Sequence, residues 1–238
     1  MSAPPPDFSI VIPIYNEEAI LQPAVLDLRE RLSGFKETYE IVLAENGSRD
    51  RTLEIAAELS NKFSEVRFVT IGQPNYGEAL REGVLSARGA LVVCDEIDLC
   101  DTDFHRRALD LLHTGTLDMV IGSKLLRGAQ DERPFVRHAA SLFYNGLLRV
   151  AVGFPGTDTH GLKAFRRDPL LPIVRACLVD RDVLASELVV RAYRAGLRIR
   201  EIPVRVLEKR TPSINLTRRV PGVLKNVARL TWAVRVRG

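Results

Sequence analysis

The chain has 238 residues, 46% of them hydrophobic and 27% charged, and a formal net charge of +4 at pH 7. This composition is ordinary for a soluble globular protein with a substantial core, built as one large α/β domain or two small ones. A membrane-spanning chain is excluded, because no stretch approaches the ~20 consecutive apolar residues of a spanning helix, and residues 1–6 lack the pattern of a secretory signal.

The first half of the chain alternates strand and helix patterns. Residues 8–14 are a continuous apolar run, which predicts a strand buried on both faces, and residues 18–32 have the period of an amphipathic helix. Further strand patterns cover residues 40–43, 66–71 and 90–93, with helix patterns between them. These units predict a parallel, doubly wound sheet whose ligands bind beyond the carboxyl ends of the strands.

The strand pattern at residues 90–93 leads into an acidic run. Five carboxylates follow within nine residues: Asp95, Glu96, Asp98, Asp101 and Asp103. Mutually repelling anions at a strand end need a countercharge, and a divalent cation with oxygen ligands supplies it. A solvated acidic turn is the alternative, and it fits Asp101 and Asp103 best, because acidic residues favour the start of a helix.

The second half is less regular, and nothing in it marks a boundary between two independent domains. Strand patterns cover residues 119–122, 162–165 and 197–206, and helix patterns cover residues 136–152, 182–195 and 221–236. After Glu208 there is no acidic residue, and eight Lys and Arg residues give this tail a charge of +8. Such a tail favours anionic partners: phosphate groups, lipid headgroups or nucleic acid.

Several motifs in chain order carry a family resemblance: residues 9–17 (SIVIPIYNE), 45–50 (ENGSRD), 75–77 (NYG), the acidic run, 122–124 (GSK) and 201–204 (EIPV). Together they resemble the family 2 glycosyltransferases with a GT-A fold, within the dolichol/polyprenyl-phosphate mannose synthase-like branch. The resemblance implies a mostly parallel α/β sheet with helices on both faces. It covers residues 8–213 and divides them into a nucleotide-binding half (8–104) and an acceptor-binding half (105–213). The residue pattern itself predicts a disordered lead (1–7) and a basic amphipathic C-terminal helix (214–238).

On the donor side, the resemblance implies that a nucleotide sugar binds along the rim of the sheet, with Mg²⁺ or Mn²⁺ on its diphosphate. The family motif is Asp-x-Asp, and here Ile97 stands where the second Asp is expected. We therefore expect Asp95 and Asp98 as the main metal ligands, with Glu96 as the competing candidate. The donor-binding residues implied in this way are Pro13, Tyr15, Glu17, Glu45, Asn75, Gly77, Asp95, Glu96 and Arg210.

On the acceptor side, the resemblance implies that Lys124, Arg137 and Ser141 hold the phosphate of a polyprenyl phosphate. A phosphate is already an anionic nucleophile at neutral pH, whereas a hydroxyl acceptor needs a general base. Asp158 and Glu187 are the carboxylates that could supply that base, and His160 could be a metal ligand, a donor to the diphosphate or a proton shuttle. The expected catalytic residues are thus Asp98, Arg137, Asp158, His160 and Glu187.

The expected activity is an inverting, metal-dependent transfer of a sugar from GDP-mannose or a UDP-hexose to a polyprenyl phosphate. Two alternatives stay open: the same chemistry on a soluble hydroxyl acceptor, and a non-catalytic nucleotide-sugar-binding protein.

Three cysteines in no disulfide pattern favour the cytoplasm. Residues 214–238 either contact the inner face of the membrane or pack on the domain, and a nucleic-acid partner is not expected.

Overall fold

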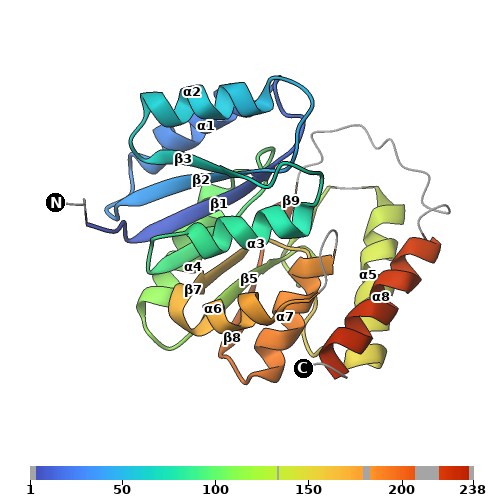
Figure 1. Ribbon diagram of the computed structural model, residues 1–238. Coiled ribbons are helices and arrows are strands. Elements are labelled where there is room, and N and C mark those ends of the chain that lie inside the picture. The colour runs from blue at the N-terminus through green and yellow to red at the C-terminus, as the bar shows by residue number, and fades with distance from the viewer. Residues whose placement is uncertain (1–3, 133, 179–182, 207–219, 236–238) are drawn as a thin grey trace.

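The computed structural model describes residues 4–132, 134–178, 183–206 and 220–235. Its centre is a seven-stranded sheet in the order β3-β2-β1-β4-β7-β5-β8 (Figure 1). β7 runs antiparallel to both of its neighbours, and the other pairs are parallel. The strands are β1 (Phe8–Ile14), β2 (Tyr39–Glu45), β3 (Val66–Thr70), β4 (Leu91–Cys94), β5 (Met119–Ser123), β7 (Lys163–Arg166) and β8 (Ile199–Pro203).

Helices cover both faces of this sheet, as the sequence predicts. In chain order the helices of the described residues are α1 (Leu21–Leu32), α2 (Thr52–Lys62), α3 (Tyr76–Ser86), α4 (Thr102–His113), α5 (Phe135–Val152), α6 (Arg167–Ala176), α7 (Leu184–Arg194) and α8 (Val220–Arg235). Of these, α5 and α8 lie side by side at one edge of the molecule, beyond the helices that cover the sheet (Figure 1). Side chains of β1 alternate between the two layers: Ile10 and Ile12 pack with α1, α2 and α4, and Val11 packs with α3, α6 and α7. The predicted mostly parallel α/β sheet is confirmed.

Two elements differ from the sequence prediction. The pattern did not predict α6, whose sequence contains Pro169 and Pro172; Leu170 and Val174 nevertheless bury against the core, and this packing holds the helix. The strand expected over residues 197–206 divides at Val204 into β8 and a short β9 (Arg205–Val206), which pairs with β6 (Gln130–Asp131) in a separate two-stranded sheet.

The described part of the C-terminal segment is α8, which packs against α5 and α7. Its apolar stripe points into the protein, because Val227, Leu230, Ala233 and Val234 are buried in the core. Of the two alternatives that the sequence leaves open for this segment, packing on the domain therefore holds for these residues. Within the described ranges, no helix has both the length and the hydrophobicity to cross a bilayer.

Candidate active site

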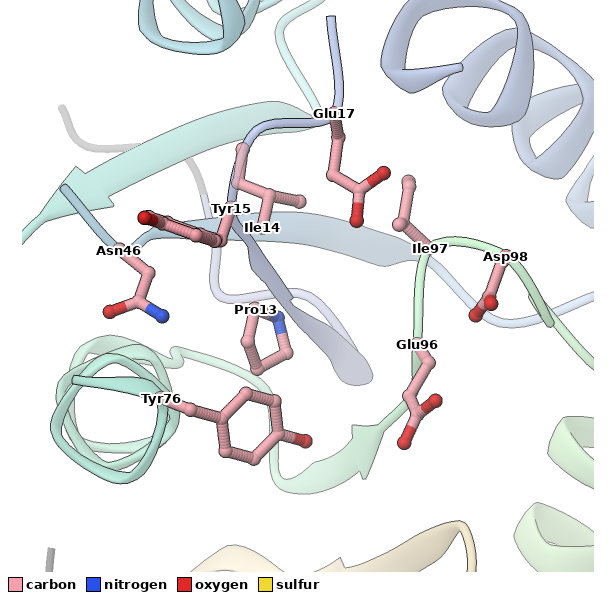
Figure 2. A pocket seen from close by; sticks show the side chains of 9 residues that line it. All are labelled: Pro13, Ile14, Tyr15, Glu17, Asn46, Tyr76, Glu96, Ile97 and Asp98. Atoms are coloured by element: carbon pink, nitrogen blue, oxygen red, sulfur yellow. The ribbon is translucent and has the colours of Figure 1, made fainter. Parts of the chain in front are cut away.

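A cleft of about 190 Å³ opens at the carboxyl edge of the sheet. Parallel pairing brings the ends of β1, β2 and β4 to this edge, where the start of α3 joins them. Figure 2 shows the side chains that line the cleft: Pro13, Ile14, Tyr15, Glu17, Asn46, Tyr76, Glu96, Ile97 and Asp98. Among these, Pro13, Tyr15, Glu17, Glu96 and Asp98 are residues that the sequence predicted for the donor or its metal.

The acidic run after β4 divides between the cleft and the interior. Asp95 turns inward and is 3% exposed, with Oδ2 2.5 Å from Nε2 of the buried His105. Asp95 also accepts a hydrogen bond from the amide of Asp101 at 3.0 Å, and Asp101 in turn caps α4. The expectation that Asp95 is a main metal ligand is not supported by this geometry, because its carboxylate serves to anchor α4.

Glu96 and Asp98 instead line the cleft, on either side of the buried Ile97. Ile97 packs in the core beneath the sheet edge, and the turn around it carries the two carboxylates outward. Poor solvation in the cleft raises the pKa of Glu96, and the negative charges of Asp98 and Asp95 raise it further. Two carboxylates that repel each other in one cleft favour a cation between them.

These residues fit a divalent cation that is shared with a diphosphate. Among the described residues, no three His, Cys, Asp or Glu side chains converge as a complete ligand set. Mg²⁺ sites of nucleotide-binding enzymes use one or two carboxylates and take their other ligands from water and substrate phosphates. Glu96 and Asp98 are the two carboxylates that would hold the cation in such an arrangement.

Glu45 lies outside the cleft, contrary to its expected contact with the donor base. It is 1% exposed, and its two oxygens accept hydrogen bonds from the amide of Ser48 and the hydroxyl of Thr70, both at 2.5 Å. Burial raises the pKa of this carboxyl, but these hydrogen bonds outweigh burial and hold the pKa below its usual range. Glu45 therefore shapes the turn after β2, and its neighbour Asn46 lines the cleft instead.

Asn75 and Gly77 position Tyr76, which belongs to one of the sequence motifs but was given no role by the sequence analysis. Asn75 caps α3, since its Oδ1 accepts from the amide of Glu78 at 3.2 Å, and its own amide donates to Oδ1 of Asn46. Gly77 is buried in the first turn of this helix. Between them, Tyr76 places its ring in the wall of the cleft, with its hydroxyl on the side of Glu96 (Figure 2). The Asn-Tyr-Gly motif indicated this position in the sequence, because a tyrosine in the first turn of α3 lies beside the carboxyl ends of the strands.

A second cluster forms where β5 ends and the chain enters β7. Gly161 passes so close to Gly122 that an added Cβ would lie 1.7 Å from the Gly122 carbonyl oxygen. This approach brings Lys124 to Asp158, with Nζ 3.1 Å from Oδ2. The amide of His160 donates to the other carboxylate oxygen at 2.9 Å.

The environment of Asp158 argues against the expected role as a general base. The side chain is 1% exposed. Burial raises its pKa, but the charge of Lys124 and the hydrogen bonds outweigh burial, so that the pKa lies below its usual value. A carboxylate that is stabilised in this way is a poor proton acceptor at neutral pH.

Glu187 also has a different place from the one expected. It is fully buried, both of its oxygens lie 3.0 Å from the amide of Leu178, and Nε of Arg191 donates to it at 2.7 Å. Arg191 reaches on to the carbonyl of Ala233 in α8 at 3.0 Å. The carboxylate therefore fastens α7 to its surroundings and is not directed into the donor cleft.

The remaining acceptor-side residues lie on α5 and beside it. Arg137 and Ser141 are half-buried one turn apart on α5, and the Ser141 hydroxyl donates to the Arg137 carbonyl at 3.0 Å. His160 is exposed, with Nδ1 3.3 Å from the Thr159 hydroxyl, and its ring packs edge-to-face with Tyr144 at 4.9 Å between ring centroids. Arg210 lies outside the described residues.

Lys163 is a further charged residue that sequence reasoning missed. It is 3% exposed, and its ammonium group donates to the Gly161 carbonyl at 2.7 Å. Burial lowers its pKa, although the negative charges of Asp158 and Glu96 oppose the shift. In the sequence, the sign of this buried cation is a lysine within the apolar strand pattern of residues 162–165. Lys163 lies between the donor cleft and the Lys124–Asp158 pair.

Comparison with known proteins agrees with this architecture. The model of the family described as "Glycosyl transferase family 2" matches residues 9–171. Glycosyltransferase AglD of Haloferax volcanii is 30% identical over 97% of this chain, which spans 38% of AglD. The dolichyl-phosphate hexose transferase of the same organism is 28% identical over 85% of this chain and 84% of that protein.

Solved structures extend the comparison to the fold. Glucosyl-3-phosphoglycerate synthase from Mycobacterium tuberculosis, in complex with Mn²⁺, UDP-glucose and phosphoglyceric acid, superposes with a TM-score of 0.67 and 22% identity. The match covers 97% of this chain and 80% of that structure. At this level of identity the similarity establishes a shared GT-A-like fold.

Proposed function

This chain belongs to glycosyl transferase family 2, and we propose that it is an inverting hexosyltransferase with a nucleoside-diphosphate hexose as donor and a polyprenyl phosphate as acceptor. Relatives named dolichyl-phosphate hexose transferase and dolichyl-phosphate β-glucosyltransferase support this choice of acceptor. In this proposal residues 8–104 form the donor-binding half, which agrees with the cleft at the ends of β1, β2 and β4, and residues 105–213 bind the acceptor.

The observation that carries the acceptor proposal is that both carboxylates that could act as a general base are already paired with other groups. Asp158 is paired with Lys124, and Glu187 accepts from Arg191 and the Leu178 amide. A hydroxyl acceptor would need one of these carboxylates to remove its proton. A phosphate acceptor needs no base, because it is already an anionic nucleophile at neutral pH.

The donor would lie in the cleft with its base between Tyr15 and Tyr76 and its diphosphate toward Glu96 and Asp98. Aromatic rings and Pro13 offer apolar faces to a base, and Asn46 offers an amide for hydrogen bonding. A divalent cation bound with the diphosphate supplies positive charge that stabilises the leaving nucleoside diphosphate.

The reaction is a single displacement at the anomeric carbon. An oxygen of the acceptor phosphate forms the new bond, and the bond from the anomeric carbon to the donor diphosphate breaks with its electron pair left on the diphosphate. The configuration inverts because attack and departure occur on opposite sides of the sugar. Lys124 and Arg137 orient the acceptor phosphate and offset its charge as it approaches the anionic donor.

A donor and acceptor matrix tests this function. The purified chain would be given UDP-glucose or GDP-mannose, with Mn²⁺, Mg²⁺ or chelator, and a polyprenyl phosphate, the matching polyprenol or 3-phosphoglycerate. We expect product only with the polyprenyl phosphate and only with metal. Transfer to the polyprenol or to phosphoglycerate would favour a soluble or hydroxyl acceptor. Nucleotide binding without any turnover would identify a binding protein instead.

A further inference from the structure

The outward side of α5 exposes a stripe of large apolar side chains. Val136, Phe143 and Val150 are 58%, 58% and 84% exposed, and their spacing of two helical turns aligns them on one face. Leu142, 52% exposed, widens the same face. A surface helix normally turns such residues toward the core, so a contiguous apolar face in solvent indicates a contact surface.

α8 adds a second exposed face in the same layer. α5 and α8 lie side by side at the edge of the molecule, outside the helices that cover the sheet (Figure 1). Leu224 and Trp232 are each 49% exposed, while the opposite side of α8 is buried against the protein. Tryptophan with an exposed apolar neighbour is typical of helices that lie at a lipid–water boundary.

The charge of this two-helix layer has one sign. Neither α5 nor α8 contains an aspartate or glutamate, although the whole chain has 30 of them. Four cations of the layer are exposed: Arg149, Lys225, Arg229 and Arg235. An apolar face on two helices that carry cations and no carboxylate is complementary to a surface that is apolar inside and anionic at its boundary.

We propose that the outward faces of α5 and α8 dock this protein on a membrane surface that contains anionic lipids. The apolar side chains enter the boundary between headgroups and acyl chains, and the exposed cations pair with lipid phosphates. A second copy of the chain fits this face less well, because a two-fold contact would oppose four exposed cations to four others. The contact surface thus differs from the sequence expectation, which assigned it to residues 214–238 alone.

The docking goes beyond the proposed reaction but agrees with it. Arg137 and Ser141 lie on the other side of α5 from the exposed stripe, as helical periodicity requires. A helix at the membrane surface would then separate the lipid environment on one side from the proposed acceptor residues on the other.

Vesicle sedimentation of the full chain, without donor or acceptor, tests the proposal independently of any transferase activity. Vesicles would contain phosphatidylcholine alone, or phosphatidylcholine and phosphatidylglycerol in equal parts. We expect binding to the mixed vesicles that weakens with salt. The variant Val136→Ser/Phe143→Ser/Val150→Ser should bind at least about tenfold more weakly, because each lost apolar side chain removes more than about 1 kcal/mol of burial.

A matched control removes exposed apolar side chains elsewhere. Leu26→Ser/Leu53→Ser changes residues of α1 and α2 that are 37% and 41% exposed and should leave vesicle binding unchanged. A Lys225→Gln/Arg229→Gln variant should lose affinity for the anionic vesicles alone. Thermal unfolding by circular dichroism verifies that each variant is folded.

Three results would overturn the proposal. The first is a wild-type chain that binds neither type of vesicle. The second is a folded α5 variant whose vesicle binding equals that of the control. The third is a wild-type dimer in analytical ultracentrifugation that the α5 variant converts to a monomer, which would assign the face to contact between copies.

Discussion

The ammonium nitrogen of Lys124 lies 3.1 Å from Oδ2 of Asp158, and the two side chains are only 11% and 1% exposed. The pair joins the end of β5 to the loop that enters β7, two segments that meet because Gly161 passes directly over Gly122. A shielded pair of this kind holds the lysine in a defined position, so that a cation is presented where we propose that the acceptor phosphate binds.

We predict that Asp158→Asn acts through this pair and not through the loss of a base. The variant leaves Lys124 shielded without its partner, which should lower the free energy of unfolding by about 3 kcal/mol. Urea unfolding measures this loss. Transfer per folded molecule should fall less than about tenfold, whereas loss of a general base costs about 10²–10⁴-fold. A stable variant with a 10³-fold lower rate would identify Asp158 as the base.

Lys124→Gln is predicted to weaken acceptor binding selectively. Removing one charge-assisted hydrogen bond to a phosphate costs about 1.5–3 kcal/mol, so the acceptor KM should rise about ten- to a hundredfold. The donor KM should stay unchanged, because Lys124 does not line the donor cleft. Steady-state kinetics with each substrate varied in turn separates the two effects, and a raised donor KM would contradict this assignment.

Glu96→Gln and Asp98→Asn are each predicted to weaken metal-dependent nucleotide binding. Both residues line the cleft, so loss of either charge should weaken the Mn²⁺-dependent thermal shift caused by nucleoside diphosphate and lower transfer at least about a hundredfold. Asp103→Asn is the matched control: it removes a carboxylate of the same run that is exposed on α4 and paired with Arg107. Equal effects of Asp98→Asn and Asp103→Asn would rule out a specific metal site at the cleft.

Gly161→Ala should destabilise the protein at the crossing of β5 and β7. The added methyl group would lie 1.7 Å from the Gly122 carbonyl oxygen, and backbone at that distance can only move away. We expect a loss of at least about 3 kcal/mol in urea unfolding. Gly146→Ala, on α5 with nothing within 4 Å of the new methyl group, should instead be neutral or stabilise by up to about 1 kcal/mol. Similar stability of both variants would contradict the close approach.

Glu40 should make stability depend on pH in the acid range. It is 5% exposed and accepts from Ser9 at 2.6 Å, Arg67 at 2.8 Å and the amide of Arg88 at 2.7 Å. Burial raises its pKa, but these hydrogen bonds outweigh burial and hold the folded-state pKa below the ordinary value of 4.5. Its contribution is therefore complete above pH 4.5 and is lost as the pH falls through the folded-state pKa.

Urea unfolding of Glu40→Gln at several pH values checks this prediction. The variant should be clearly less stable than wild type at neutral pH, and the difference should shrink as the pH falls below 4.5. Glu58→Gln, at an exposed position on α2, should stay within about 0.5 kcal/mol of wild type at neutral pH. A Glu40→Gln difference that stays constant from neutral to acid pH would show that the lost contacts do not depend on the charge.

Local patterns in the sequence were sufficient to predict a mostly parallel sheet and the edge at which the cleft lies. The apolar run of residues 8–14 and the helix period of residues 18–32 reflect the two-faced burial that their own elements require. Because parallel strands end at one edge, the residues after β1 and β4 had to meet there. Pro13, Tyr15, Glu17, Glu96 and Asp98 line one cleft for this reason.

Which carboxylate faces the cleft could not be predicted from spacing. Asp95 and Asp98 are both acidic and stand three residues apart, yet Asp95 turns inward because His105, ten residues later on α4, lies 2.5 Å from it. Glu45 accepts a hydrogen bond from Thr70 in the neighbouring strand, and Asp158 forms an ion pair with Lys124, which is 34 residues away in the chain. Partners brought together by strand pairing leave no local pattern.

The amino-acid sequence alone thus specified a mostly parallel α/β sheet and the edge at which the cleft lies, since burial periodicity is a short-range pattern, and its motifs specified the family. Tertiary packing decided the roles of the charged residues. A buried charge takes the nearest counterion or hydrogen-bond donor that the fold offers, as Asp95, Glu45 and Asp158 do, whereas the turn after β4 places Glu96 and Asp98 at the cleft. Packing also turned the apolar stripe of α8 inward and exposed that of α5.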